Sequence, residues 1–109
     1  MLEPLLDSPV KEKILLAVLA RGESYPRELA RTFGLPVYAV QYQLGRLERG
    51  GVLYSRLRGR TRLYGFNPRY PFLRELRALL GKARDFYAPD ERAAWFEPRL
   101  RPRRAGKPL

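Results

Sequence analysis

Cysteine and histidine are both absent from this sequence of 109 residues. Their absence excludes disulfide bonds, zinc sites built from thiolate and imidazole ligands, and acid-base catalysis by histidine. Catalysis would therefore need paired carboxylates or a lysine, and most of the acids stand singly along the chain. The one adjacent pair, Asp90 and Glu91, falls at an expected helix start, where capping and the helix dipole explain both residues. We expect no catalytic residue, no metal site and no cofactor, and hence no enzyme.

Long apolar runs are missing as well. No stretch approaches the roughly 18 residues that cross a membrane, and the N-terminus lacks the charged-then-apolar pattern of a signal peptide. We therefore expect a soluble, cytoplasmic protein that does not insert into membranes.

Acidic residues are outnumbered two to one, with 11 Asp and Glu against 22 Lys and Arg, giving a net charge of +11 and a pI near 10.7. A chain this basic favours an anionic partner, with nucleic acid ahead of a membrane surface. Residues 98–109 hold five basic residues and no acid, so we expect a disordered basic tail after one domain at 1–97. The remaining +6 makes that domain basic without the tail.

Three helices are expected in the first half of the chain. Ser8 is a suitable N-cap, and Pro9 fits the first helical position, where its missing N–H costs nothing. Gly22 ends this helix, and a second runs from Pro26 to Gly34. In the third helix, over 36–49, the apolar residues recur at steps of three and four and form one buried stripe, namely Val37, Val40, Leu44 and Leu47. The opposite side is aromatic, amide and guanidinium, a composition that suits contact with a polyanion.

The segment VLYSRLRGRTRLYGF has extended-chain composition on both sides of Gly59 and predicts a β-hairpin. Core contacts are expected from Leu53, Leu57 and Leu63. The arginines near the tip are Arg56, Arg58, Arg60 and Arg62, and we expect them on the face shared by Tyr54 and Tyr64, without a compensating acid. A last amphipathic helix is predicted over 71–86, and 89–96 is expected to add one or two turns anchored by Trp95 and Phe96.

This order of helix, helix, turn, helix, hairpin and helix, over residues 8–84, resembles the winged helix-turn-helix of ArsR-like and MarR-like bacterial and archaeal transcriptional regulators. ELARTFGLPVYAVQYQLGRLERGGVL is similar to the helix-turn-helix with the first wing strand, and RLRGRTRLYGFNP is similar to the wing. The resemblance implies a mainly α fold with a small β-hairpin, in the order α-α-α-β-β-α, and a long C-terminal helix.

The resemblance also implies roles for individual residues. The helix at 36–49 would enter the major groove of double-stranded DNA, and the wing would meet the adjacent minor groove or its phosphates. The expected DNA-binding residues are Tyr38, Gln41, Tyr42 and Arg46 on the helix, and Arg56, Arg58, Arg60 and Arg62 on the wing. Metal-sensing members of the family use Cys and His ligands, so the usual sensor sites are excluded here.

A homodimer is a further implication, because these regulators generally pair through their terminal helices. For the helix at 71–86 the alternatives are packing within the chain and self-association, and we favour self-association. The expected interface residues are Leu73, Leu76, Leu80 and Ala83. The leading hypothesis is a sequence-specific DNA-binding regulator, a repressor that reads an inverted repeat as a homodimer.

Other interpretations stay open. The segment YGFNPRYPFLRELRALLGKA is similar to the subset of these regulators found beside, or fused to, small nucleotidyltransferase domains. The chain would then be a module that binds a separate nucleotidyltransferase, or one that binds nucleic acid without sequence preference. For Tyr38 and Tyr42 the plain alternative is a contact at the edge of the core or with a second copy in a dimer, and for the wing arginines it is solvated surface charge.

Overall fold

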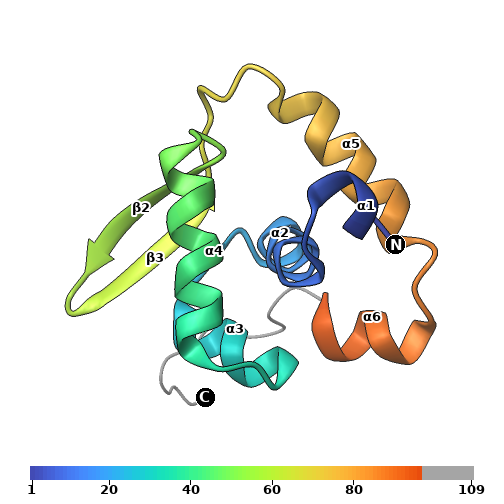
Figure 1. The fold of residues 1–109 in the computed structure, drawn as a ribbon, viewed down its shortest axis with the longest axis horizontal. Helices are drawn as coiled ribbons and strands as arrows, with labels where there is room; N and C mark the ends of the chain where they lie inside the picture. The colour runs from blue at the N-terminus through green and yellow to red at the C-terminus, as the bar shows by residue number, and fades with distance from the viewer. Residues whose placement is uncertain (97–109) are drawn as a thin grey trace, which may run out of the picture.

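The structure, a computed structural model, describes residues 1–96. In chain order the elements are α1 (Glu3–Leu6), α2 (Pro9–Arg21), β1 (Glu23–Ser24), α3 (Pro26–Phe33), α4 (Val37–Arg49), β2 (Leu53–Arg58), β3 (Thr61–Phe66), α5 (Leu73–Arg84) and α6 (Pro89–Trp95) (Figure 1). This confirms the expected mainly helical winged helix-turn-helix fold, with a small additional strand, β1. The expected tail at 98–109 lies outside the described residues, and so does the expected domain end at 97.

The helix boundaries follow local chemistry. The Ser8 hydroxyl accepts a hydrogen bond of 3.0 Å from the backbone N–H of Lys11, as expected of an N-cap. Within the helix-turn-helix, Gly34 terminates α3 with φ 64°, a left-handed conformation that glycine adopts without steric cost. The turn between α3 and α4 is therefore determined by local sequence.

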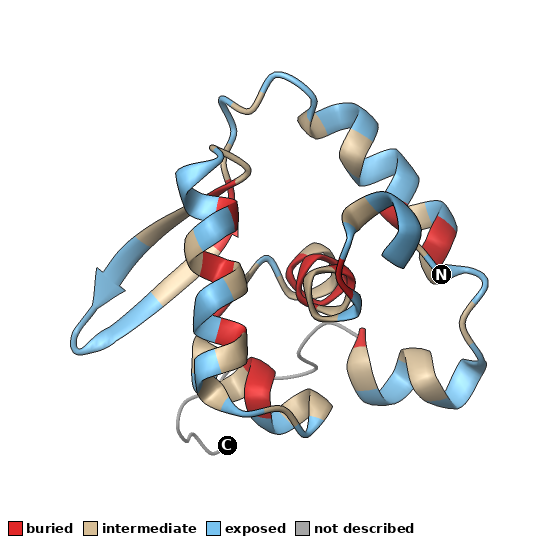
Figure 2. Cartoon of the chain, in the orientation of Figure 1, coloured by how far each residue is buried: buried red, intermediate tan, exposed pale blue. Residues whose placement is uncertain are grey.

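Helix α2 is the centre of the molecule, and α1, α3, α4, α5 and the sheet pack against it (Figure 1). Residues 14–18 are all buried, so this part of α2 is enclosed on every side. In α4 the buried residues are Val40, Leu44 and Leu47, which confirms three of the four positions of the predicted stripe. Figure 2 shows buried positions along α2 and on the inward side of α4, while the outward side of α4 is exposed.

The sheet has three strands in the order β1-β3-β2, all antiparallel. The sequence did not predict β1, because two residues are too few for an alternating pattern. The hairpin register pairs Arg58 with Thr61 and Arg56 with Leu63. Residues opposite each other share a face, so Arg56 and Arg58 lie on one face of the sheet and Arg62 on the other.

Two expectations about the hairpin were therefore wrong. Arg62 and Tyr64 do not share a face with Arg56 and Tyr54, because the two-residue turn pairs even-numbered positions of β2 with odd-numbered positions of β3. Leu57 and Leu63 do not supply core contacts: Leu57 lies near the wing tip and is 59% exposed, and Leu63 lies on the face opposite to Leu53 and does not pack against the core. Leu53, at the other end of β2, is buried as expected.

Helix α5 uses its apolar face within the chain. Leu80 and Ala83 are buried, and Leu73 and Leu76 pack against the core as partly buried side chains. Leu80 and Ala83, two of the expected interface residues, are thus buried within a single chain. Any partner of α5 would have to meet a different side of the helix.

Helix α6 forms over the segment that was predicted to add one or two helical turns, and it packs back onto the rest of the chain. Phe96 is fully buried, and its ring lies 6.1 Å from that of Phe33 and 5.0 Å from that of Tyr87. Arg21 at the end of α2 donates a hydrogen bond of 3.0 Å to the carbonyl of Trp95. These contacts hold the end of the described chain against α2 and α3.

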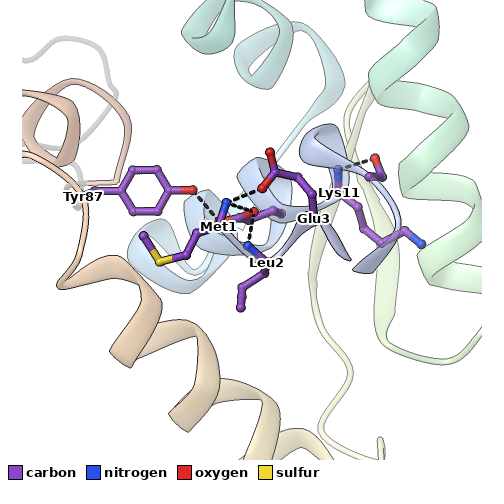
Figure 3. Close-up of polar contacts among 7 residues, drawn as sticks. Met1, Leu2, Glu3, Lys11 and Tyr87 are labelled. Atoms are coloured by element: carbon purple, nitrogen blue, oxygen red, sulfur yellow. Dashed lines mark hydrogen bonds and ion pairs between the residues drawn. The ribbon is translucent and has the colours of Figure 1, made fainter. Parts of the chain in front are cut away.

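Glu12 of α2 is a buried carboxylate that binds both the N-terminal segment and the turn before α6. Figure 3 shows Met1 and Leu2 of that segment close to Tyr87 of that turn. One of the Glu12 carboxylate oxygens accepts a hydrogen bond of 2.8 Å from the backbone N–H of Leu2 and lies 3.3 Å from the amino group of Met1. The Tyr87 hydroxyl donates to the other oxygen. Burial, followed by this hydrogen bond, raises the pKa of Tyr87. A buried charge with several partners is tolerated, whereas an unpaired one is costly.

Candidate nucleic-acid interface

The outward side of α4 carries the predicted recognition residues. Tyr38 and Tyr42 are 74% and 57% exposed, and Gln41 and Arg46 lie beside them on the same helix. The tyrosines are therefore not at the edge of the core, the plain alternative considered from sequence. No acidic residue lies in the first turn of α4, and Pro36 at its N-cap offers no capping side chain. The start of the helix is left open to an anion.

Tyr42 and Arg46 interact with each other one helical turn apart. The Arg46 Nη1 donates to the Tyr42 hydroxyl at 3.3 Å, and the guanidinium carbon lies 5.7 Å from the centre of the ring. A long cationic side chain stacked on an aromatic ring loses fewer conformations when it binds a ligand. The pair presents a hydroxyl and a guanidinium together on the exposed side of α4.

An open groove of about 330 Å³ runs between α4, the start of α3 and the tip of the wing. Its lining residues are Tyr25, Pro26, Arg27, Val37, Gln41, Arg60, Thr61 and Arg62. None of these is acidic, and three are arginines. The groove thus joins one predicted helix residue, Gln41, to two predicted wing residues, Arg60 and Arg62. Tyr38, Tyr42 and Arg46 lie on the same helix but do not line it.

Arg56 forms an ion pair across the sheet with Glu23. Its Nε and Nη2 donate to the two carboxylate oxygens of Glu23 at 2.9 and 2.8 Å. The Tyr54 hydroxyl also donates to Glu23. The bond from Arg56, more than that from Tyr54, lowers the pKa of the Glu23 carboxyl to about 2. The expectation that no acid compensates the wing arginines was therefore wrong for Arg56, because β1 brings Glu23 across the sheet to it.

Gly65 makes this pairing possible. It lies on the middle strand, directly opposite both Glu23 of β1 and Tyr54 of β2. A Cβ atom at this position would come within 2.6 Å of the Tyr54 hydroxyl and 2.8 Å of its ring. Because glycine has no side chain there, Tyr54 can lie across the middle strand and reach Glu23 on the far side. The base of the wing is thereby tied to the strand that precedes α3.

Arg62 lies on the opposite face, toward α4. Its Nη1 donates to the Ser55 hydroxyl at 2.9 Å, and that hydroxyl donates to a carboxylate oxygen of Glu48 at 2.6 Å. The chain of hydrogen bonds links the wing to α4. It holds the Arg62 side chain between the two elements, where Arg62 also lines the groove.

Arg58 and Arg60 form no hydrogen bond or ion pair with any of residues 1–96, and both are exposed at the wing tip. Gly59 between them has φ 62°, the conformation that this tight turn requires. These two side chains therefore keep their charge available to a ligand. The four predicted wing arginines thus fall into three groups: Arg56 paired, Arg62 bridged to α4, and Arg58 and Arg60 unpaired.

Arg27 lies in the groove but was not predicted from sequence. It occupies the first turn of α3, where a positive charge opposes the helix dipole. Such a locally unfavourable choice is a signal for function, and it could have pointed to this residue. Tyr25, which precedes α3 and also lines the groove, carries no comparable signal.

Metal ligands and membrane spans are both missing from the described part of the chain. Within residues 1–96, no three His, Cys, Asp or Glu side chains are grouped so that they could hold a metal ion. Over the same residues, every helix is too short or too polar to cross a membrane.

No family model and no curated protein sequence matches this chain. Among solved structures, it is similar to the crystal structure of a protein described as the predicted DNA-binding transcriptional regulator from E. coli. The TM-score is 0.62 at 22% sequence identity, over 79% of this chain and 85% of the other. At this identity the likeness concerns the fold. The chain therefore has a winged helix fold, with an arginine-rich groove between the second helix of its helix-turn-helix and its wing.

Proposed function

We propose that this protein is a transcriptional regulator that binds double-stranded DNA, with α4 in the major groove and the wing on the adjacent backbone. The observation that carries the proposal is the groove between α4 and the wing tip. Its lining holds Gln41 together with Arg27, Arg60 and Arg62, and no carboxylate. A phosphodiester backbone is the anion whose shape and charge match an open groove of this kind.

The residues divide into two kinds of contact. Gln41 on α4 reads base edges, because its amide can donate to and accept from an adenine at the same time. The unpaired arginines of the wing tip, Arg58 and Arg60, and Arg27 at the start of α3 bind phosphates and set the register of the protein on DNA. Tyr38, Tyr42 and Arg46 extend the helix surface along the major groove.

Two further observations support this proposal. The structurally similar E. coli protein is itself described as a DNA-binding transcriptional regulator. The exposed side of α4 is also unobstructed by the rest of the described chain, so the helix is open to a major groove. We further propose that the protein acts as a homodimeric repressor on an inverted repeat, since a two-fold protein matches a palindromic site.

Selection of bound sequences from a random duplex pool at near-physiological salt tests the proposal. We expect an enriched inverted repeat, and a steep fall in affinity with added salt that reflects about six to ten phosphate contacts. Gln41→Ala should relax the sequence preference at one position. Arg74→Ala is the matched control, because Arg74 lies on α5 with an almost fully exposed side chain.

An unenriched pool with strongly salt-dependent binding would overturn sequence-specific regulation. That result would favour the alternative of a module that binds nucleic acid without sequence preference. Absence of DNA binding altogether, even at low salt, would favour a protein partner such as a separate nucleotidyltransferase.

A further inference from the structure

A glycine lies in the middle of the exposed side of α4. Tyr38, Tyr42, Gly45 and Arg49 follow one another at steps of four, three and four residues, so they lie on one stripe of the helix, with Gln41 beside it. Glycine inside a helix costs stability relative to alanine, since its backbone loses more freedom on folding. A helix surface that only faced solvent would therefore be more stable with alanine at position 45.

Packing within the described chain does not require this glycine. Outside the helix's own backbone, the atoms closest to a Cβ atom added to Gly45 all belong to the guanidinium of Arg49, with Nη1 at 3.2 Å. Arg49 is exposed and its side chain is long, so it can move aside by the few tenths of an ångström that a methyl group needs. Gly65 is the opposite case, because a Cβ atom there would meet the ring of Tyr54 at 2.8 Å. No contact within residues 1–96 thus explains a glycine at position 45.

We propose that Gly45 is a notch in the exposed side of α4 that receives the methyl group of a thymine in the major groove. The proposal rests on the proposed function and adds to it the base that is read at this position. Thymine carries the one apolar group on the major-groove edges of the four bases. Gly45 offers only its Cα–H groups there, since its N–H and C=O lie within the helical hydrogen bonds of α4. An apolar methyl group suits a surface without a free donor or acceptor.

The neighbours of Gly45 fit this role. Gln41 lies one turn before it, a rise of about 5.4 Å, while successive base pairs of DNA lie about 3.4 Å apart. The notch therefore stands one or two base pairs beyond the adenine that Gln41 would read. Tyr42, whose side chain is 57% exposed, forms a wall on the other side of the notch. Arg49, which covers the notch in the free protein, would be released to a phosphate.

Replacement of single thymines by uracil, which lacks only the methyl group, tests the DNA side of the proposal. The duplex is the sequence obtained from the selection described above, and each of its thymines is replaced in turn. We expect at least one thymine whose replacement weakens binding of the full chain by about fourfold, the value for one buried methyl group. Fluorescence anisotropy of a labelled duplex measures the affinities.

Gly45→Ala tests the protein side, because it fills the notch. On the thymine duplex it should weaken binding by at least about tenfold, since the added methyl group meets the thymine methyl group. On the duplex with uracil at that position the loss should be much smaller, because the space is free again, so the preference for thymine should disappear or reverse. The same variant should raise the unfolding temperature, because alanine is the better helix former. Stability and affinity would then change in opposite directions.

Gly81→Ala is the matched control. Within residues 1–96, Gly81 is the other glycine inside a helix, and it lies on α5 with no atom within 4 Å of an added Cβ atom. The variant should also raise the unfolding temperature. The ratio of its affinities for the thymine and uracil duplexes should stay that of the wild type, because α5 lies away from the exposed side of α4.

Three results for Gly45→Ala would overturn the notch. Unchanged affinity would show that nothing approaches Gly45 closely. Equal losses on the two duplexes would indicate a seat for Arg49 or a contact with the DNA backbone, and a lower unfolding temperature would show that the chain's own packing needs the glycine. A wild type that selects a duplex but tolerates uracil at every position would overturn the notch and leave the proposed function standing. A wild type that binds no duplex would overturn both.

Discussion

Arg56 and Glu23 face each other across the middle strand of the sheet, 33 positions apart in sequence, and form a paired hydrogen bond of 2.9 and 2.8 Å. The pair connects β2 of the wing with β1, which leads into α3. It therefore links the base of the wing to the helix-turn-helix, and we expect Arg56 to help position the arginines at the tip.

Glu23→Gln should remove a pH-dependent part of the stability. The pKa of this carboxyl is about 2 in the folded protein against an ordinary value of 4.5, so between these pH values the unfolded chain binds more protons. The contribution of the pair to the free energy of unfolding is complete above about pH 4.5 and is lost as the pH falls toward 2. We expect the free energy of unfolding of the variant to be lower by about 1–2 kcal/mol at neutral pH. This is less than the full pKa shift would give, because Arg56 is half exposed and solvent screens the pair.

Urea denaturation of both proteins from about pH 2 to pH 7 would measure this difference. The two unfolding free energies should converge as the pH approaches the lower limit. A constant difference over the whole range would contradict the assignment of the shift to this pair.

Gly65→Ala should destabilise the sheet by about 1–3 kcal/mol, because the new methyl group would clash with the ring of Tyr54 and break its bond to Glu23. The cost should shrink when Tyr54 is itself replaced by alanine, since the clashing ring is then gone. A double-mutant cycle with Gly65→Ala and Tyr54→Ala, followed by thermal unfolding, measures this coupling. Additive effects would show that the strain lies elsewhere.

Glu12→Gln should lower the unfolding free energy by about 1–3 kcal/mol, since the buried carboxylate accepts bonds from Leu2 and Tyr87 and lies beside the amino group of Met1. An amide keeps the shape but cannot accept at both atoms. Chemical denaturation measures the loss. Asp7→Asn is the control, because Asp7 is exposed with φ 63° and asparagine also tolerates that conformation.

Arg60→Ala and Arg56→Ala should act differently on DNA binding. Removing Arg60 should lower the slope of affinity against salt concentration by roughly one, because an unpaired cation that contacts a phosphate is lost. Removing Arg56 should change the slope less and the stability more, because its charge is already balanced by Glu23. If both variants changed the slope of affinity against salt concentration equally, the distinction between the paired Arg56 and the unpaired Arg60 would be contradicted.

The fold could be predicted from sequence wherever a local rule determined it. Ser8 and Gly34 set helix ends through their own backbone and side-chain chemistry, and the period of the apolar residues in α4 determined its buried side. The exposed side of α4 could then be predicted as well, because it lies opposite the buried side. The placement of Tyr38 and Tyr42 on that side could therefore be predicted from helical periodicity alone.

What could not be predicted depended on distant pairing. The two residues of β1 gave no pattern, so the contact of Glu23 with Arg56 was invisible in sequence. The face of Arg62 depended on the hairpin register, which a one-residue difference reverses, and the exposure of Leu57 depended on how far the wing extends beyond the core. For α5, the sequence contained an apolar stripe but gave no sign that its residues would be buried within the chain by packing onto α2.

The two-residue turn at Gly59 and Arg60 has a consequence for how such proteins diversify. Because cross-strand partners share a face, the register set at this turn decides which residues of β3 lie on the face toward α4. A shift of β3 by one position would turn Arg62 away from α4, but it would also turn Phe66, which is buried opposite Leu53, out of the core. The core therefore holds the register of the wing, so we expect such proteins to vary the side chains at the wing tip and to keep the pairing at its base.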